Sequence, residues 1–119
     1  MSYPLGRVIA DRQLRDSENP SREVRLLIGE PQQFPDAPNG DYYCPFQVVG
    51  VGSEKVLYAG GIDSLQAIEL AVLILPSVLE NLRRDNPGLG WADAPPGDYG
   101  LSVTVMSHPR NPEIGGGEQ

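Results

Sequence analysis

The chain has 119 residues, which is the length of a single domain with one modest hydrophobic core. Nine basic and sixteen acidic residues give a net charge of −7, so duplex DNA and RNA are not expected as ligands. One cysteine excludes an internal disulfide, no charged-then-apolar leader opens the chain, and the apolar run at 70–75 is too short to span a bilayer. We therefore expect a cytoplasmic protein that does not bind membranes.

Two segments of alternating hydropathy, residues 7–14 and residues 22–28, come first in the chain. A cluster of turn-forming residues at 16–21 separates them. We predict an antiparallel hairpin with one face in water, on which opposite charges can pair across the strands. Residues 31–40 contain three prolines and an Asn-Gly pair, and they are predicted to form a loop without a strand.

Residues 42–51 and 55–59 are the next two predicted strands, because both are rich in β-branched and aromatic residues. A glycine-containing turn at 52–54 joins them. Pro45 cannot donate a ladder hydrogen bond, so we expect the first of these strands to lie at a sheet edge or to be bulged there. Cys44 is expected to be a small buried apolar residue.

A helix is predicted from about Ser64 to Arg84. Asp63 is expected to cap its first turn, and Gln66 to complete an Asp-x-x-Gln variant of the capping box. Pro76 lies inside the helix and is expected to kink or split it. Apolar residues recur at spacings of three and four, which predicts a stripe that packs on a sheet: Leu65, Ile68, Val72, Leu75, Leu79 and Leu82.

The end of the chain contributes a predicted loop at 89–98 and a predicted strand at 100–106. The resulting order β-β-β-β-α-β predicts an α+β fold, with an antiparallel sheet of four or five strands and one long Pro-kinked helix on one face. We expect residues 1–108 to form a single domain and residues 109–119 to be a disordered tail.

The start of the predicted helix resembles the motif at which acyl and peptidyl carrier proteins attach their prosthetic arm. The residues that fit are Gly61, Ile62, Asp63, Ser64, Leu65, Ala67, Ile68, Glu69 and Leu70. The resemblance implies that Ser64 would carry phosphopantetheine and that the acidic helix would dock enzymes. Carriers are helical bundles, whereas strands are predicted immediately before this motif. An ordinary helix start is therefore favoured, in which Gly60 and Gly61 let the chain turn sharply.

Residues 42–82 also resemble a group of small bacterial proteins that share a domain of unknown function. The pattern is a Y-x-C-P-[FY]-x-[IV] strand followed by Y-x-A-G-G-[IV]-D-x-x-Q-A at a helix start. Residues 42–48 and 58–67 fit it. The resemblance implies a fold and a bacterial origin, and it implies no activity.

No catalytic, cofactor or metal site is predicted. Glycines at 50 and 52 lead into a strand and not into a helix, which disfavours a phosphate loop. His108 is the only histidine, and together with one cysteine it cannot supply a usual zinc site. The candidate interaction surface consists of aromatic and acidic residues, namely Tyr42, Tyr43, Tyr58, Asp63, Glu69 and Trp91.

The leading hypothesis from the sequence is a non-enzymatic module that binds another protein, of the inhibitor, immunity or regulatory type. The type is an analogy drawn from class and charge. Residues 41–82 hold five acids against one lysine, so a basic partner would suit this segment. Two alternatives stay open, a carrier modified at Ser64 and a small-molecule binder that uses the gap between helix and sheet. The sequence leaves the choice between monomer and homodimer open.

Overall fold

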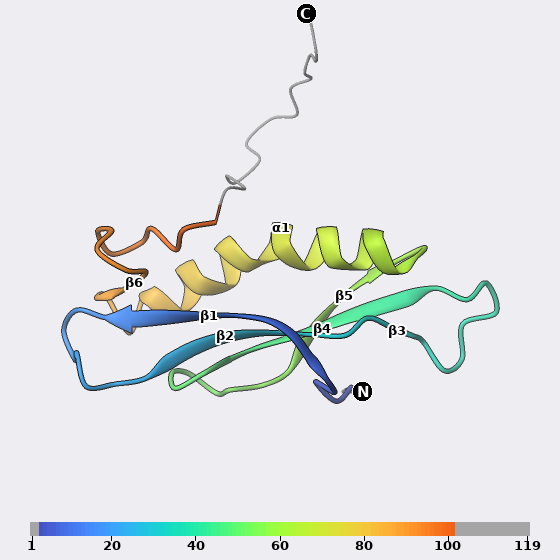
Figure 1. Cartoon of the computed structure of the whole chain (residues 1–119), viewed down its shortest axis with the longest axis horizontal. Coiled ribbons are helices and arrows are strands. Elements are labelled where there is room, and N and C mark those ends of the chain that lie inside the picture. The colour runs from blue at the N-terminus through green and yellow to red at the C-terminus, as the bar shows by residue number, and fades with distance from the viewer. Residues whose placement is uncertain (1–2, 102–119) are drawn as a thin grey trace, which may run out of the picture.

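The structure, a computed structural model, describes residues 3–101. Figure 1 shows one long helix lying along one face of a sheet, which confirms the predicted α+β class. The elements are β1 (Val8–Asp16), β2 (Val24–Gly29), β3 (Gln32–Gln33), β4 (Tyr42–Val49), β5 (Leu57–Gly61), α1 (Ser64–Arg83) and β6 (Leu89–Gly90).

Strand β4 lies at the centre of the sheet. Its residues Tyr42 and Tyr43 pair with both β3 and β5, and Phe46 pairs with both β2 and β5. Because a strand has only two edges, β2 and β3 share one edge of β4, and β5 occupies the other. Strand β1 pairs antiparallel with β2, and β6 pairs with the last two residues of β1.

The predicted hairpin is confirmed as β1 and β2, and one of its faces is in water. Leu14, Val24 and Leu26 are buried in the core on the helix side. On the opposite face Arg25 forms an ion pair with Asp11 across the two strands. Both side chains are half exposed, so this pair contributes a few tenths of a kcal/mol at most, on the order of 0.5.

Of the two alternatives expected for Pro45, a sheet edge or a bulge, the sheet edge was wrong. The pairing is nevertheless irregular at Pro45, because on the β2/β3 edge neither Cys44 nor Pro45 has a register partner between the two paired segments. The buried Cys44 thiol approaches the Gly29 carbonyl oxygen there, at 3.7 Å. A proline is thus tolerated in a central strand because the ladder changes partners at that point.

Helix α1 begins as predicted, with one change in the cap. The Asp63 carboxylate accepts a hydrogen bond from the Gln66 backbone N–H at 2.8 Å. The Gln66 side chain accepts from the Ile62 N–H at 2.8 Å, one residue earlier than a capping box requires. Pro76 does not split the helix, which is continuous, although Figure 1 shows its axis bending part-way along. By length and composition alone α1 could cross a membrane, but here it packs on β4 and β5.

The buried face of α1 is rotated relative to the predicted stripe. Leu75 and Leu79 are buried as expected, but the residues that complete the buried face are Ala67 and Ala71. Leu65, which was predicted to be buried, is 65 % exposed. The first half of the helix therefore meets the sheet with its two smallest side chains.

This rotation follows from how closely α1 approaches β5. A Cβ atom added to Gly61 would lie 2.5 Å from the Ala67 backbone nitrogen, and one added to Gly60 would lie 3.5 Å from the Phe34 ring. Neither glycine has a positive φ. The two glycines therefore provide space on the two faces of the strand, and the expected sharp turn is not their role.

Two short strands lie where loops were predicted, because tertiary pairing and not local propensity forms them. Strand β3 lies within 31–40 and pairs with Tyr42 and Tyr43, and β6 opens the segment 89–98. Gly100 and Leu101 have no regular structure. The rest of the strand predicted at 100–106, His108 and the tail predicted at 109–119 lie outside the described residues.

We expect Gly61→Ala to destabilise the fold by about 1–3 kcal/mol, because the helix must move away from β5 to admit a methyl group. Gly60→Ala is the matched control, since its methyl would meet Phe34 at an ordinary contact distance and should change stability by less than about 0.5 kcal/mol. Urea unfolding followed by circular dichroism measures both. Equal stabilities for the two variants would contradict the close approach.

Candidate functional site

Two of the predicted surface residues, Tyr43 and Tyr58, lie on the face of the sheet that is turned away from α1. They form an aromatic cluster with Tyr3 and Phe34, whose ring centroids are separated by 4.4–6.1 Å. Tyr43 is buried beneath it, and Tyr58 is 43 % exposed. The cluster mainly covers the second face of the sheet, and Tyr58 is the member that it offers to solvent.

Tyr42 and Trp91 do not join this cluster. Tyr42 packs against the main core. Trp91 lies under the guanidinium of Arg12, whose carbon is 4.3 Å from the ring centroid. Arg12 also donates hydrogen bonds to the carbonyl oxygens of Tyr99 and Gly100, at 3.1 and 2.7 Å. Trp91 and Arg12 thus hold the segment after β6 against β1, which is a structural role.

Asp63 and Glu69 are exposed and lie at the first half of α1, where Ser64 is also exposed. In the same part of the helix, large apolar side chains are turned to solvent. We call these residues the outer helix face: Leu65 (65 % exposed), Leu70 (38 %), Leu73 (43 %) and Ile74 (40 %). Ile62, just before the cap, is 71 % exposed. Such a group of exposed aliphatic residues on one side of a helix is typical of an interaction surface.

The outer helix face was missed by the sequence prediction, although a signal for it existed. Leu70, Leu73 and Ile74 lie outside the apolar stripe that was assigned to the core. A helix with more large apolar residues than one stripe can hold must expose some of them. The prediction instead selected aromatic residues, which the structure distributes over three separate places.

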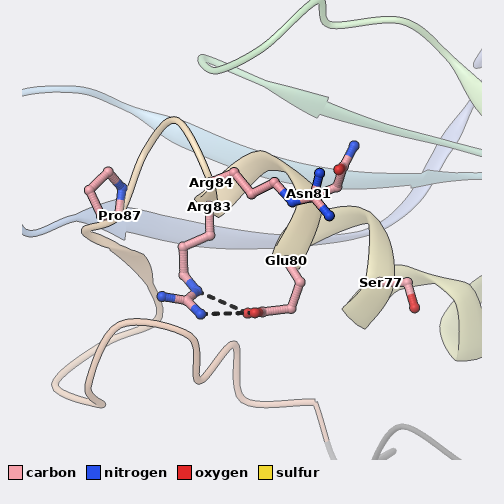
Figure 2. A pocket seen from close by; sticks show the side chains of 6 residues that line it. All are labelled: Ser77, Glu80, Asn81, Arg83, Arg84 and Pro87. Carbon is pink, nitrogen blue, oxygen red and sulfur yellow. Dashed lines mark hydrogen bonds and ion pairs between the residues drawn. The ribbon is translucent and has the colours of Figure 1, made fainter.

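The second half of α1 is polar on its outer side. The Arg83 guanidinium donates two hydrogen bonds to the Glu80 carboxylate, at 2.9 and 3.0 Å, and the Tyr99 hydroxyl donates a third, at 2.7 Å. The Arg83 bonds, and then the Tyr99 bond, lower the pKa of Glu80 to about 2. Figure 2 shows Glu80 and Arg83 beside an open hollow of about 620 Å³, which is lined by Ser77, Glu80, Asn81, Arg83, Arg84 and Pro87.

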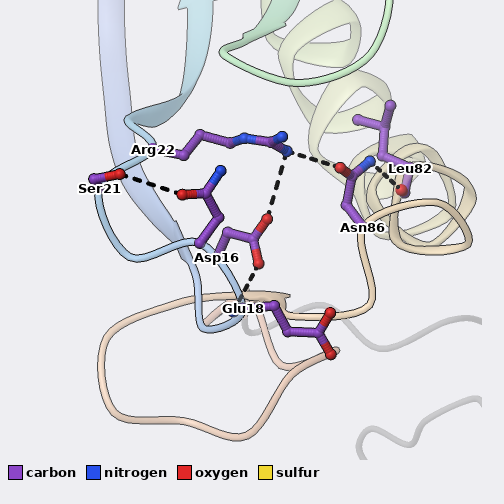
Figure 3. Close-up of polar contacts among 7 residues, drawn as sticks. Asp16, Glu18, Ser21, Arg22, Leu82 and Asn86 are labelled. Carbon is purple, nitrogen blue, oxygen red and sulfur yellow. Dashed lines mark hydrogen bonds and ion pairs between the residues drawn. The ribbon is translucent and has the colours of Figure 1, made fainter.

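A charged network holds the hairpin turn to the end of α1 (Figure 3). Asp16, which is buried, accepts from the Glu18 N–H at 3.0 Å and pairs with Arg22 at 3.4 Å. Arg22 donates to Asn86 at 2.8 Å, and Asn86 donates to the Leu82 carbonyl oxygen at 2.9 Å. These contacts join the hairpin turn to the last turn of α1, so the network has a structural role.

Three further features of the described residues bear on the predicted site chemistry. No group of three metal-ligating side chains gathers among them. Burial raises the pKa of the Cys44 thiol to about 11, which keeps it protonated and unreactive at neutral pH. Between α1 and the first two strands lies an apolar cavity of about 150 Å³, lined by Ala10, Asp11, Arg12, Leu26, Ile28, Val72, Leu75 and Leu101. This volume is below the range of roughly 300–1,000 Å³ that is usual for ligand pockets.

Comparison of the sequence with known protein families assigns this domain to a family. The sequence matches the domain of unknown function DUF6968 over residues 10–103. The chain belongs to the DUF6968 family. No curated protein and no solved structure matches it. The DUF6968 match begins inside β1 and takes in every later element, so the outer helix face and the hollow beside it are both part of the family domain.

The low pKa of Glu80 predicts how the stability of this DUF6968 domain depends on pH. Because the pKa in the folded state is below its ordinary 4.5, the Glu80 contacts stabilise the fold fully above pH 4.5 and are lost as the pH falls toward 2. We expect the Glu80 carboxyl to titrate near pH 2 by NMR. Tyr99→Phe should raise this pKa, because one donor is removed while Arg83 remains.

Glu80→Gln is the corresponding stability experiment. The variant should lose less stability than the wild type between pH 4.5 and pH 2, because it lacks the group that titrates there. Denaturant unfolding at a series of pH values measures the difference. An unchanged difference in stability across that window would show that the bonds to Glu80 do not form in solution.

Proposed function

We propose that this DUF6968 domain is a non-enzymatic module that binds another protein chain through the outer helix face. The observation that carries the proposal is the exposure of Leu65, Leu70, Leu73 and Ile74 on one side of a helix whose opposite side is already packed on the sheet. Neither the core nor the fold requires large apolar residues at these positions. A partner that covers them would gain about 1–2 kcal/mol for each of the more exposed leucines.

The acidic residues at the edge of this surface support a partner with basic groups. Asp63 lies at the N-terminal end of the outer helix face, and Glu69 lies within the same half of the helix. Charges at the rim of an interface mainly set the association rate and the choice of partner, and they are sensitive to salt.

The inhibitor, immunity or regulatory type of this module is an analogy from fold class, size and charge alone. The same proposal places the protein in the cytoplasm, which its single cysteine supports. The small-molecule alternative receives less support, because the apolar cavity between helix and sheet is small.

Site-specific photo-crosslinking in cells tests the proposal. A photoreactive amino acid placed at Leu70 should give a covalent adduct with a protein chain, because this side chain lies on the outer helix face. The matched control is the same amino acid at Gln13, which is exposed on the water-facing side of the hairpin. Adducts that form equally at both positions, or at neither, would refute a role for the outer helix face.

The carrier alternative has its own test at Ser64. This residue is exposed at the first position of α1, as a modified serine would need to be. The residues before it, however, form β5 and not the helix of a carrier bundle. Incubation with a phosphopantetheinyl transferase and coenzyme A should therefore leave the intact mass unchanged. A mass increase that disappears in Ser64→Ala would overturn this expectation and favour the carrier.

A further inference from the structure

We propose that the chain which covers the outer helix face is a second copy of this chain, with the two α1 helices antiparallel across a two-fold axis beside Leu73 and Ile74. This inference rests on the proposed function, since it names the partner of the same surface. A two-fold interface requires one patch to complement itself. The outer side of α1 meets this requirement in apolarity, in charge and in shape.

The apolar residues are self-complementary about this axis. In the antiparallel register Leu73 of one copy lies opposite the partner's Ile74, and Leu70 lies opposite the partner's Ser77, which leaves room for it. These three aliphatic residues are 38–43 % exposed in the single chain, so each has surface for the partner to bury. Aliphatic side chains that meet at the centre of a helix pair are the usual contact of packed helices.

The charges of α1 select the antiparallel arrangement. Asp63 precedes Leu73 by the same number of residues as Arg84 follows Ile74, so Asp63 of each copy lies opposite the partner's Arg84. Among the described residues Arg84 forms no salt bridge, whereas the neighbouring Arg83 is paired with Glu80. A parallel pair would instead bring the two Asp63 carboxylates together. Both helix ends thus meet an opposite charge only when the copies run antiparallel.

The shape of the surface agrees with the same register. The hollow of about 620 Å³ lies beside the second half of α1, and in Figure 2 the side chains of Ser77, Asn81 and Arg84 border it. The antiparallel pairing places Leu70 of each copy opposite the partner's Ser77, at the border of this hollow. Leu65 is nine residues before Ile74, which is half a turn around the helix, so it lies at the flank of the contact.

Sedimentation equilibrium over a series of concentrations tests the dimer. The wild type should be a reversible dimer, and Leu73→Glu should weaken it at least about tenfold, since two carboxylates would meet at the axis. Leu73 lies outside the core, so the variant should keep the wild-type circular dichroism spectrum, and its unfolding midpoint should not depend on concentration where that of the wild-type dimer does. Gln13→Glu, which adds the same charge at an exposed position on the far face of the sheet, is the control, and it should leave the dimer unchanged.

Reversing the charge of Arg84 tests the antiparallel pairing of Arg84 with the partner's Asp63. Arg84→Glu should weaken the dimer about tenfold, because each new carboxylate faces the partner's Asp63. Adding Asp63→Asn should restore most of the loss, since asparagine removes the repulsion and still caps the helix. A dimer that is insensitive to both Leu73→Glu and Arg84→Glu would overturn the inference, as would a double variant no tighter than Arg84→Glu alone.

A monomer at all concentrations would also overturn the inference, and the crosslinking at Leu70 then decides about the proposed function. An adduct of twice the chain mass supports the second copy. An adduct with a different protein refutes the second copy and leaves the proposed function standing. The absence of any Leu70-specific adduct, together with a monomer, removes both.

Discussion

The close contact between the start of α1 and strand β5 is the constraint on which the rest of the structure depends. Gly61 leaves no room for a Cβ atom against the Ala67 backbone, and Ala59, Ala67 and Ala71 are all buried where helix and strand meet. Small side chains let the two backbones approach, and the helix has to present its small residues to keep that contact. The rotation of α1 about its axis is thereby set at its first turn.

Once this rotation is set, the positions of the other apolar residues of α1 follow. Leu75 and Leu79 continue the buried face toward β4, whereas Leu65 and Leu73 point to the opposite side. The exposed leucines are therefore a consequence of using alanine for close packing. Their number remains unexplained by the fold, because polar residues at the same positions would serve the helix equally well. This excess of exposed apolar area links the packing of α1 to its proposed role in binding.

The sequence predicted those features that depend on local chemistry. The β1–β2 hairpin, the start of the helix at Ser64 and the Asp63 cap all follow from short-range patterns and were found as expected. Features that depend on neighbours in space were missed. The pairing of β3 and β6, the central place of Pro45 and the side of α1 that is buried are decided by tertiary contacts, which a single sequence does not display.

The same distinction explains why the start of α1 resembles a carrier motif. A strand that passes into a closely packed helix needs a residue without a side chain at position 61, a capping residue at 63 and small or apolar residues after it. These requirements produce a sequence like that of a carrier site without any prosthetic group. Here Gly61 is explained by the Ala67 backbone, and Asp63 by the Gln66 N–H. Leu65 and Leu70 are the two leucines of the motif, and neither the cap nor the core explains them; both lie on the outer helix face. The two leucines of the motif that do not pack in the core are thus the ones available for binding a partner.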